Sequence, residues 1–113
     1  MHNKKPKSYK DPKTAFRRSK PWHDLRMRTR KKQKYDYITG SPLTPTYNLH
    51  HICEDPERYS DISDESLFVG LNSTSHTCIH FLWGDGKRRF NWKERLERLK
   101  QLCERMDEVN GVE

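Results

Sequence analysis

Four of the six histidines fall within 31 residues, as two close pairs. His50 and His51 are adjacent in YNLHHICED, and His76 and His80 stand four apart in HTCIH. Residues four apart share one face of a helix, so His76 and His80 can bind one metal ion together. Because neutral imidazole is a common metal ligand, the two pairs predict one shared metal site rather than four unrelated side chains.

Short segments of different periodicity are expected to position these histidines. YDYITGSPL predicts a short strand and a turn, TYNLHHIC predicts a strand that carries the first pair, and LFVGL predicts a compact buried strand. The polar, acidic residues 54–66 predict a long surface loop, and STSHTCIHFLW predicts a helix that carries the second pair. Adjacent strand residues point to opposite faces, so a bulge or the strand's end must turn one of the two adjacent histidines.

The last segment has the most regular helical pattern, over about residues 91–109. Asn91 is a good N-cap, and Glu94 stands three residues on, as in a capping box. We expect the apolar stripe of this helix to pack onto the domain, although its heptad-like spacing also suits a homodimer. The stripe consists of Trp92, Leu96, Leu99, Cys103 and Met106.

Charge is distributed unevenly along the chain. Residues 1–34 hold 14 Lys and Arg against two acidic residues, whereas the remainder holds 9 against 14. Residues 1–18 are lysine-rich and predict a disordered basic arm, and residues 19–113 predict a single domain that opens with a basic helix. Trp22 and Leu25 would pack that helix, while its other face meets a phosphate backbone. The candidate nucleic-acid contacts are Arg26, Arg28, Arg30, Lys31 and Lys32.

The composition narrows the class of protein. Hydrophobic residues make up 31% of 113 residues and charged residues 35%, which predicts one domain with a modest core. Three cysteines without CxxC spacing argue against a secreted disulfide framework. No apolar stretch is long enough to cross a membrane, and the basic N-terminus lacks the apolar region of a secretory signal. We therefore expect a cytoplasmic protein.

The segment from Tyr35 to Trp83 resembles an HNH nuclease of the ββα-metal (His-Me finger) type, particularly the small phage-encoded members. The resemblance rests on YDYITGSPL, YNLHHI and DISDESLFVGLNSTSHTCIH, within 49 of the 113 residues. KPWHDLRMRTRKKQKY also resembles the Trp-containing basic segment that often precedes this motif. The resemblance implies an α+β fold, with a ββα-metal core at about 35–84 between a basic N-terminal helix and a long C-terminal helix.

The same resemblance implies a metal-dependent endonuclease that hydrolyses DNA, most simply double-stranded DNA. His50 and His76 take the positions of metal ligands, and His80 matches an extra ligand of some members, notably the DNase colicins. His51 takes the position of the general base, which removes a proton from water. One divalent ion would act as Lewis acid, and three imidazoles favour Zn²⁺, Ni²⁺ or Mn²⁺ over Mg²⁺. Such a protein would act as a monomer or homodimer, in a bacterial host cell if phage-encoded.

Two departures from the family pattern bear on these expectations. Many members carry a zinc knuckle of four cysteines, and no structural zinc is expected here because the matching positions are Asp36, Thr39, Asn72 and Ser75. The polar residue to which the middle N of the name HNH refers aligns with Leu67, or with Ser66 if the register shifts by one. Ser66, or a backbone carbonyl of the 54–66 loop, is therefore expected to orient His51.

Two other functions remain open from the sequence. The chain could be a catalytically weak or inactive ββα-metal domain that binds nucleic acid or another partner. It could also be a structural zinc domain that uses Cys53 and Cys78 beside the histidines. Cys78 lies two residues from both His76 and His80, about 200° around a helix, so it should face away from them.

Overall fold

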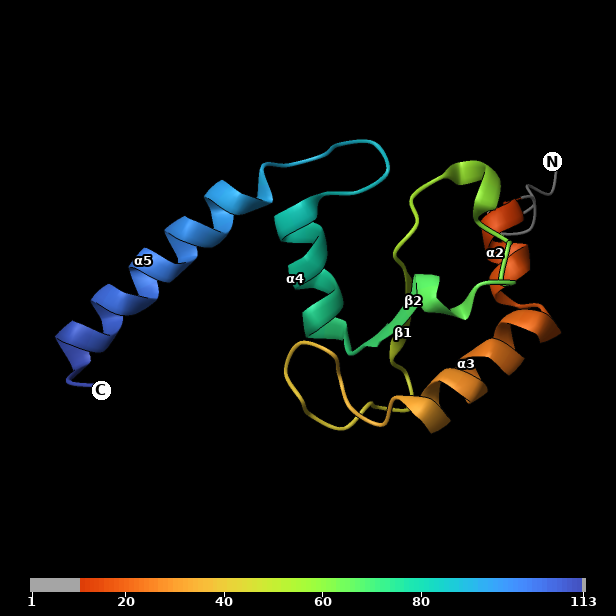
Figure 1. The fold of residues 1–113 in the computed structure, drawn as a ribbon, viewed down its shortest axis with the longest axis horizontal. Coiled ribbons are helices and arrows are strands. Elements are labelled where there is room, and N and C mark those ends of the chain that lie inside the picture. Colours follow the sequence, from red (N-terminus) through yellow and green to blue (C-terminus); the bar gives the residue numbers. More distant parts are fainter. Residues whose placement is uncertain (1–10, 113) are drawn as a thin grey trace, which may run out of the picture. The chain divides into compact units, whose positions relative to one another are not determined.

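The computed structural model describes residues 11–112, which contain four α-helices and a two-stranded antiparallel sheet (Figure 1). The elements in chain order are α2 (Pro12–Arg17), α3 (Lys20–Lys32), β1 (Asn48–His51), β2 (Phe68–Leu71), α4 (Ser73–Trp83) and α5 (Trp92–Asn110). The fold is therefore α+β with a long C-terminal helix, as predicted. The chain divides into two compact units between Ser75 and His76, within α4, and the single domain over residues 19–113 stays a prediction.

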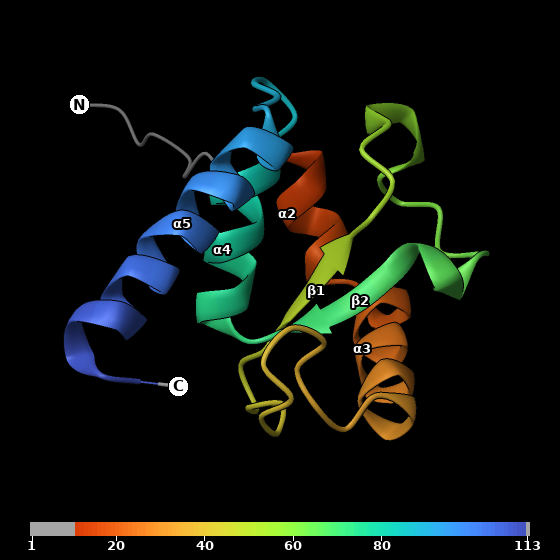
Figure 2. The ribbon, with the colours of Figure 1, turned by 60° about the vertical axis from the view of Figure 1, so that its left-hand side comes forward.

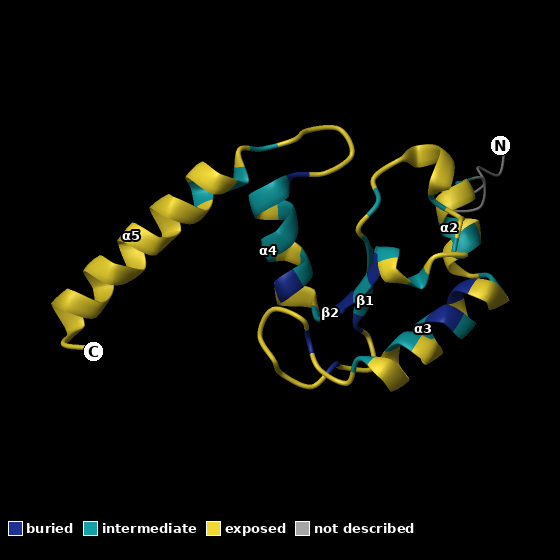
Figure 3. Cartoon of the chain, in the orientation of Figure 1, coloured by how far each residue is buried: buried dark blue, intermediate teal, exposed yellow. Residues whose placement is uncertain are grey.

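The first unit holds the hydrophobic core (Figure 3). Trp22 and Leu25 are buried on α3, so the predicted apolar face of the basic helix packs as expected. The loop after α3 adds two buried side chains and the two strands add three. The buried hydrophobic residues are Trp22, Leu25, Leu43, Tyr47, Leu49, Phe68 and Leu71. The core is modest, in keeping with the composition.

Helix α2 lies where the sequence predicted a disordered arm. Asp11 caps it by accepting a hydrogen bond from the backbone N–H of Lys13, and Pro12 occupies its first turn. Phe16 packs against the core, with its ring centroid 5.4 Å from that of Trp22. The prediction was therefore wrong for Pro12–Arg17, because one aromatic side chain anchors an otherwise polar helix. Residues 1–10 of the predicted arm lie outside the described residues.

β1 and β2 form a regular antiparallel hairpin (Figure 2). His50 pairs with Val69 and His51 with Phe68, with consecutive partners along the whole ladder. This register contains no bulge, so His50 and His51 point to opposite faces of the hairpin. His51 is the last residue of β1, and only beyond it does the strand end.

The strand expected within YDYITGSPL is not formed. Tyr35 makes one isolated bridge with Pro42, and the residues after it make a turn. The Oδ1 atom of Asp36 accepts hydrogen bonds from the backbone N–H groups of Ile38 and Thr39, at 2.8 and 2.7 Å. An aspartate that bonds to the backbone two and three residues on competes with strand pairing, which explains the turn.

The second unit contains most of α4, a connecting loop and α5. Asn91 caps α5 as predicted, and Gly111 ends it with a left-handed φ of 67°. No residue of α5 is buried, and its stripe residues Leu96 and Met106 are 46% and 54% exposed. The apolar stripe is present, but the expected burial of it is not seen within residues 11–112. Across the same residues, no helix combines the length and apolar character needed to cross a membrane.

Candidate metal centre and neighbouring histidine

Helix α4 starts one residue after β2, and two hydrogen bonds hold its first turn. The Ser75 side chain, only 2% exposed, donates from Oγ to Oδ1 of Asp36 at 2.8 Å. The backbone N–H of Asn72 donates to Oδ2 of the same carboxylate at 2.7 Å. His76 follows Ser75 directly on the same helix, so the Asp36 carboxylate helps to set the start of the segment that carries His76 and His80.

Three of the predicted metal ligands form a cluster that can hold a metal ion. One nitrogen from each of His50, His76 and His80 lies within 4.8 Å of the other two, and all three side chains are half-buried. The Nε2 atoms of His76 and His80 are 3.1 Å apart. Two nitrogens at about 2.1 Å from one ion in tetrahedral geometry would be about 3.4 Å apart, so this spacing suits joint coordination.

A hydrogen bond at one ring nitrogen of His80 determines which of its two nitrogens can bind a metal ion. His80 Nδ1 lies 2.9 Å from the carbonyl oxygen of Gly84, which can only accept a hydrogen bond. Nδ1 therefore carries the proton, and Nε2 is left with its lone pair for a metal. Burial, and to a smaller extent the charge of His80, lower the pKa of His76, which favours the neutral imidazole that metals bind.

His51 lies on the other face of the hairpin, enclosed by aromatic rings. Its ring stacks on Tyr59 with centroids 4.2 Å apart and on Trp22 at 5.4 Å, and it meets Phe68 edge-on at 4.9 Å. Its Nε2 lies 2.8 Å from the Tyr59 carbonyl oxygen, so Nε2 donates and Nδ1 is the nitrogen that can accept a proton. Burial lowers the pKa of His51, although the hydrogen bond to Tyr59 acts in the opposite direction.

The group that orients His51 is a backbone carbonyl of the 54–66 loop, the second of the two expected possibilities. The first possibility is not what the structure shows: the Ser66 hydroxyl donates to Asp64 Oδ1 at 2.6 Å, and Asp64 caps the short 3₁₀ turn that contains Ser66. Sequence reasoning did not single out Tyr59. The signal was available, because Tyr59 is the one aromatic side chain in that polar, acidic loop.

Most of the predicted nucleic-acid contacts on α3 instead hold loops of their own unit. The Arg26 guanidinium lies over the Tyr47 ring, 4.2 Å from its centroid, and donates to the Tyr47 carbonyl oxygen at 2.6 Å. Arg30 donates to the carbonyl oxygen of Thr44. The Glu65 carboxylate forms salt bridges with two more of them, Arg28 at 3.0 Å and Lys32 at 3.3 Å. Lys31 is exposed.

Two basic residues of α2 lie beside the His51 environment. Arg17 donates to the Tyr59 hydroxyl at 2.7 Å, and the Lys13 ammonium lies 5.0 Å from the centroid of the same ring. Both belong to the segment that the sequence predicted to be disordered. Their positive charges lie close to the Tyr59 ring on which His51 stacks, where they could attract a phosphate.

The four positions that match the zinc knuckle meet at one carboxylate. Asp36 Oδ1 accepts from the Thr39 N–H and hydroxyl, at 2.7 and 3.1 Å, and from Ser75, while Oδ2 accepts from Asn72. Hydrogen bonds to one buried carboxylate thus join the segments that contain these four residues. No cysteine takes part in the metal cluster found within residues 11–112.

Comparison with known proteins gave no match. Neither a protein-family model, nor a curated protein, nor a solved structure matches this chain.

Proposed function

We propose that the chain is a metal-dependent endonuclease that hydrolyses DNA phosphodiester bonds, with β1, β2 and α4 as a ββα-metal core. The observation that carries the proposal is the cluster of His50, His76 and His80, in which one ring nitrogen of each lies within 4.8 Å of the others. The residue after His50 is His51, whose ring is held in one orientation by a hydrogen bond. A divalent ion and an oriented general base are the minimal equipment for hydrolysis of a phosphodiester, and β1 carries a residue for each, on opposite faces of the hairpin.

The three clustered histidines would hold one divalent ion. Its chemistry would be that of a Lewis acid, which stabilises negative charge on phosphate oxygens. Imidazole ligands favour Zn²⁺, Ni²⁺ or Mn²⁺ over Mg²⁺. The Gly84 carbonyl would fix the tautomer of His80, and the Asp36 carboxylate would fix the start of α4, so residues outside the cluster orient two of its three ligands.

His51 would serve as the general base. Since Nε2–H is committed to the Tyr59 carbonyl, Nδ1 is the atom that would take a proton from water. Stacking on Tyr59 and Trp22 restricts rotation of the ring, so the base is oriented before substrate arrives. Lys13 and Arg17 would supply positive charge for a phosphate near this face of the hairpin.

A binding module is the second candidate function. Leu67 stands where the family has a polar residue, and the His51 ring is stacked against both Trp22 and Tyr59. Such a domain would hold DNA through its basic residues without cutting it. The three cysteines are free thiols, which suits the cytoplasm proposed for either function.

An assay of supercoiled DNA cleavage distinguishes the nuclease from the binding module. The full chain is incubated with Mn²⁺, Zn²⁺, Ni²⁺ or Mg²⁺, and nicked and linear products are measured. We expect cleavage by the wild type, loss of cleavage with retained metal binding in His51→Ala, and normal cleavage in His23→Ala. His23 is an exposed histidine of α3 and serves as the matched control. Undiminished cleavage by His51→Ala would show that His51 is not the general base. DNA binding without cleavage by the wild type would favour the binding module.

A further inference from the structure

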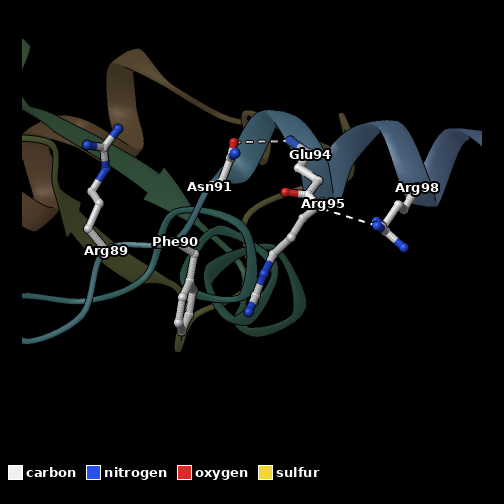
Figure 4. A pocket seen from close by; sticks show the side chains of 6 residues that line it. All are labelled: Arg89, Phe90, Asn91, Glu94, Arg95 and Arg98. Carbon is white, nitrogen blue, oxygen red and sulfur yellow. Dashed lines mark hydrogen bonds and ion pairs between the residues drawn. The ribbon is translucent and has the colours of Figure 1, made fainter.

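An open hollow lies in the second unit, where the loop after α4 meets the start of α5 (Figure 4). Its volume is about 430 Å³. The lining is dominated by positive charge, because it holds three arginines against one glutamate. The lining residues are Arg89, Phe90, Asn91, Glu94, Arg95 and Arg98.

The loop that supplies Arg89 and Phe90 is closed by its own hydrogen bonds. Gly84 forms a bridge with Arg89 and has a φ of +104°, which an L side chain rarely adopts. The Asp85 side chain accepts from the backbone N–H of Arg88 at 2.9 Å, and the N–H of Phe90 donates to the Trp83 carbonyl at 3.0 Å. The backbone under the two lining residues is therefore a defined turn.

Aromatic rings hold two of the arginines in place. The Arg95 guanidinium lies 3.8 Å from the centroid of Phe90, beside which Figure 4 shows it, and donates to the Phe81 carbonyl at 2.6 Å. The Arg89 guanidinium lies 4.4 Å from the centroid of Trp83. Stacking occupies the faces of a guanidinium and leaves edge N–H groups able to donate, the arrangement that suits a phosphate.

The charge of α5 runs against its helix dipole. Residues 92–100 of α5 contain four Lys and Arg against two acidic residues, whereas residues 101–110 contain one against three. Basic groups are unfavourable at the positive N-terminal end of a helix, by a few tenths of a kcal/mol to about 1 kcal/mol each. A bound anion would offset that cost, because the positive end of the helix and the arginines would then attract the same ligand.

We propose that this hollow binds a phosphodiester group of the DNA backbone, as a contact site separate from the metal centre. The choice of DNA over another polyanion rests on the proposed function. Arg89 and Arg98 contact the DNA backbone from the two ends of the hollow, and Arg95 lies beside Phe90 between them (Figure 4). The contact is independent of base sequence, because it reads only the phosphate charge.

DNA binding by three variants of the full chain tests this site. All carry His51→Ala, so that bound duplex stays uncut, and all are measured with metal present by fluorescence anisotropy at several salt concentrations. One has no further change, one adds Arg89→Gln and Arg98→Gln, and one adds Arg105→Gln. Arg105 is a matched control, because it pairs with Glu108 at 3.2 Å on α5 as Arg98 pairs with Glu94 at 3.2 Å.

We expect the double change to weaken binding on the order of tenfold, and to lower the slope of log affinity against log salt by about one for each phosphate that the protein no longer neutralises. Arg105→Gln should change neither. Equal effects of the double change and the control, or no effect of the double change in protein of unaltered thermal stability, would overturn the site. DNA cleavage by the wild type is measured separately. If the wild type cleaves DNA but the double change does not weaken binding, only the proposed phosphate site is wrong. If the double change weakens binding but the wild type does not cleave, the phosphate site is supported and the proposed nuclease function is wrong.

Discussion

His51 lies flat against Tyr59, with ring centroids 4.2 Å apart and an angle of 17° between the rings, while its Nε2 meets the carbonyl oxygen of the same tyrosine at 2.8 Å. One residue of the 54–66 loop thus provides both a surface for the imidazole and an acceptor for its proton. Because the two contacts come from different parts of Tyr59, substitution of its side chain separates stacking from hydrogen bonding.

Removal of the Tyr59 ring should slow DNA cleavage. Tyr59→Ala keeps the backbone carbonyl and removes the stacking surface, so His51 is less well oriented; we expect cleavage to fall on the order of tenfold or more with metal binding unchanged. Tyr59→Phe keeps the ring and removes only the hydroxyl that accepts from Arg17. It should therefore retain most of the activity. Initial rates on supercoiled DNA measure this, and equal rates for Ala and Phe would contradict it.

Loss of a clustered histidine should remove the metal and lower stability. Ligand binding to the folded state alone stabilises it by about 2.7 kcal/mol when free ligand is at 100 times its dissociation constant. His76→Ala should therefore bind less metal by elemental analysis, and its melting temperature should no longer rise when metal is added. His23→Ala is the control. A wild-type metal content in His76→Ala would show that His76 is not a ligand.

Asp36→Asn should destabilise the first unit. The buried carboxylate accepts from the backbone of Ile38, Thr39 and Asn72 and from the Ser75 hydroxyl. An amide offers only one acceptor oxygen and turns an NH₂ group toward donors, so we expect a loss of about 2–4 kcal/mol in the free energy of unfolding.

Asp61→Asn provides the comparison for that experiment. Asp61 is an exposed acidic residue whose Oδ1 accepts from the N–H and hydroxyl of Ser63. Its replacement should cost less than about 1 kcal/mol, because water can replace the missing hydrogen bonds. Chemical denaturation measures both variants, and similar losses for the two would show that burial of Asp36 contributes nothing.

Acid should weaken the fold through the same carboxylate. Burial raises the pKa of Asp36, but hydrogen bonds from Thr39, Asn72, Ser75 and Ile38 outweigh it and hold the pKa at about 2, against 3.8 in the unfolded chain. The unfolded state then binds more protons, so this contribution is complete above about pH 4 and is lost as the pH falls toward 2. Urea midpoints between pH 2 and 6 should show a steeper decline in the wild type than in Asp36→Asn, and parallel curves would contradict the assignment.

The local elements of this protein could be predicted from its sequence. Pro21 and the stripe of Trp22 and Leu25 indicated α3, the capping box at Asn91 indicated α5, and the i, i+4 spacing placed His76 and His80 on one helix face. These features depend on dihedral preferences and on neighbours within a few residues, which a sequence displays directly. The resemblance to HNH nucleases implied His50, His76 and His80 as metal ligands, and the structure brings these three side chains together in a cluster that could hold a metal ion.

Contacts between residues far apart in the sequence became known only from the folded structure. Asp36 bonds to Ser75, 39 residues away, Arg26 to the carbonyl of Tyr47, 21 residues away, and His51 to the carbonyl of Tyr59. An arginine on a polar helix face, or a tyrosine in a polar loop, is equally compatible with solvent, with DNA or with a carbonyl of the same chain. Which of these it meets depends on how loops return to the core, and that is set by packing rather than by local preference.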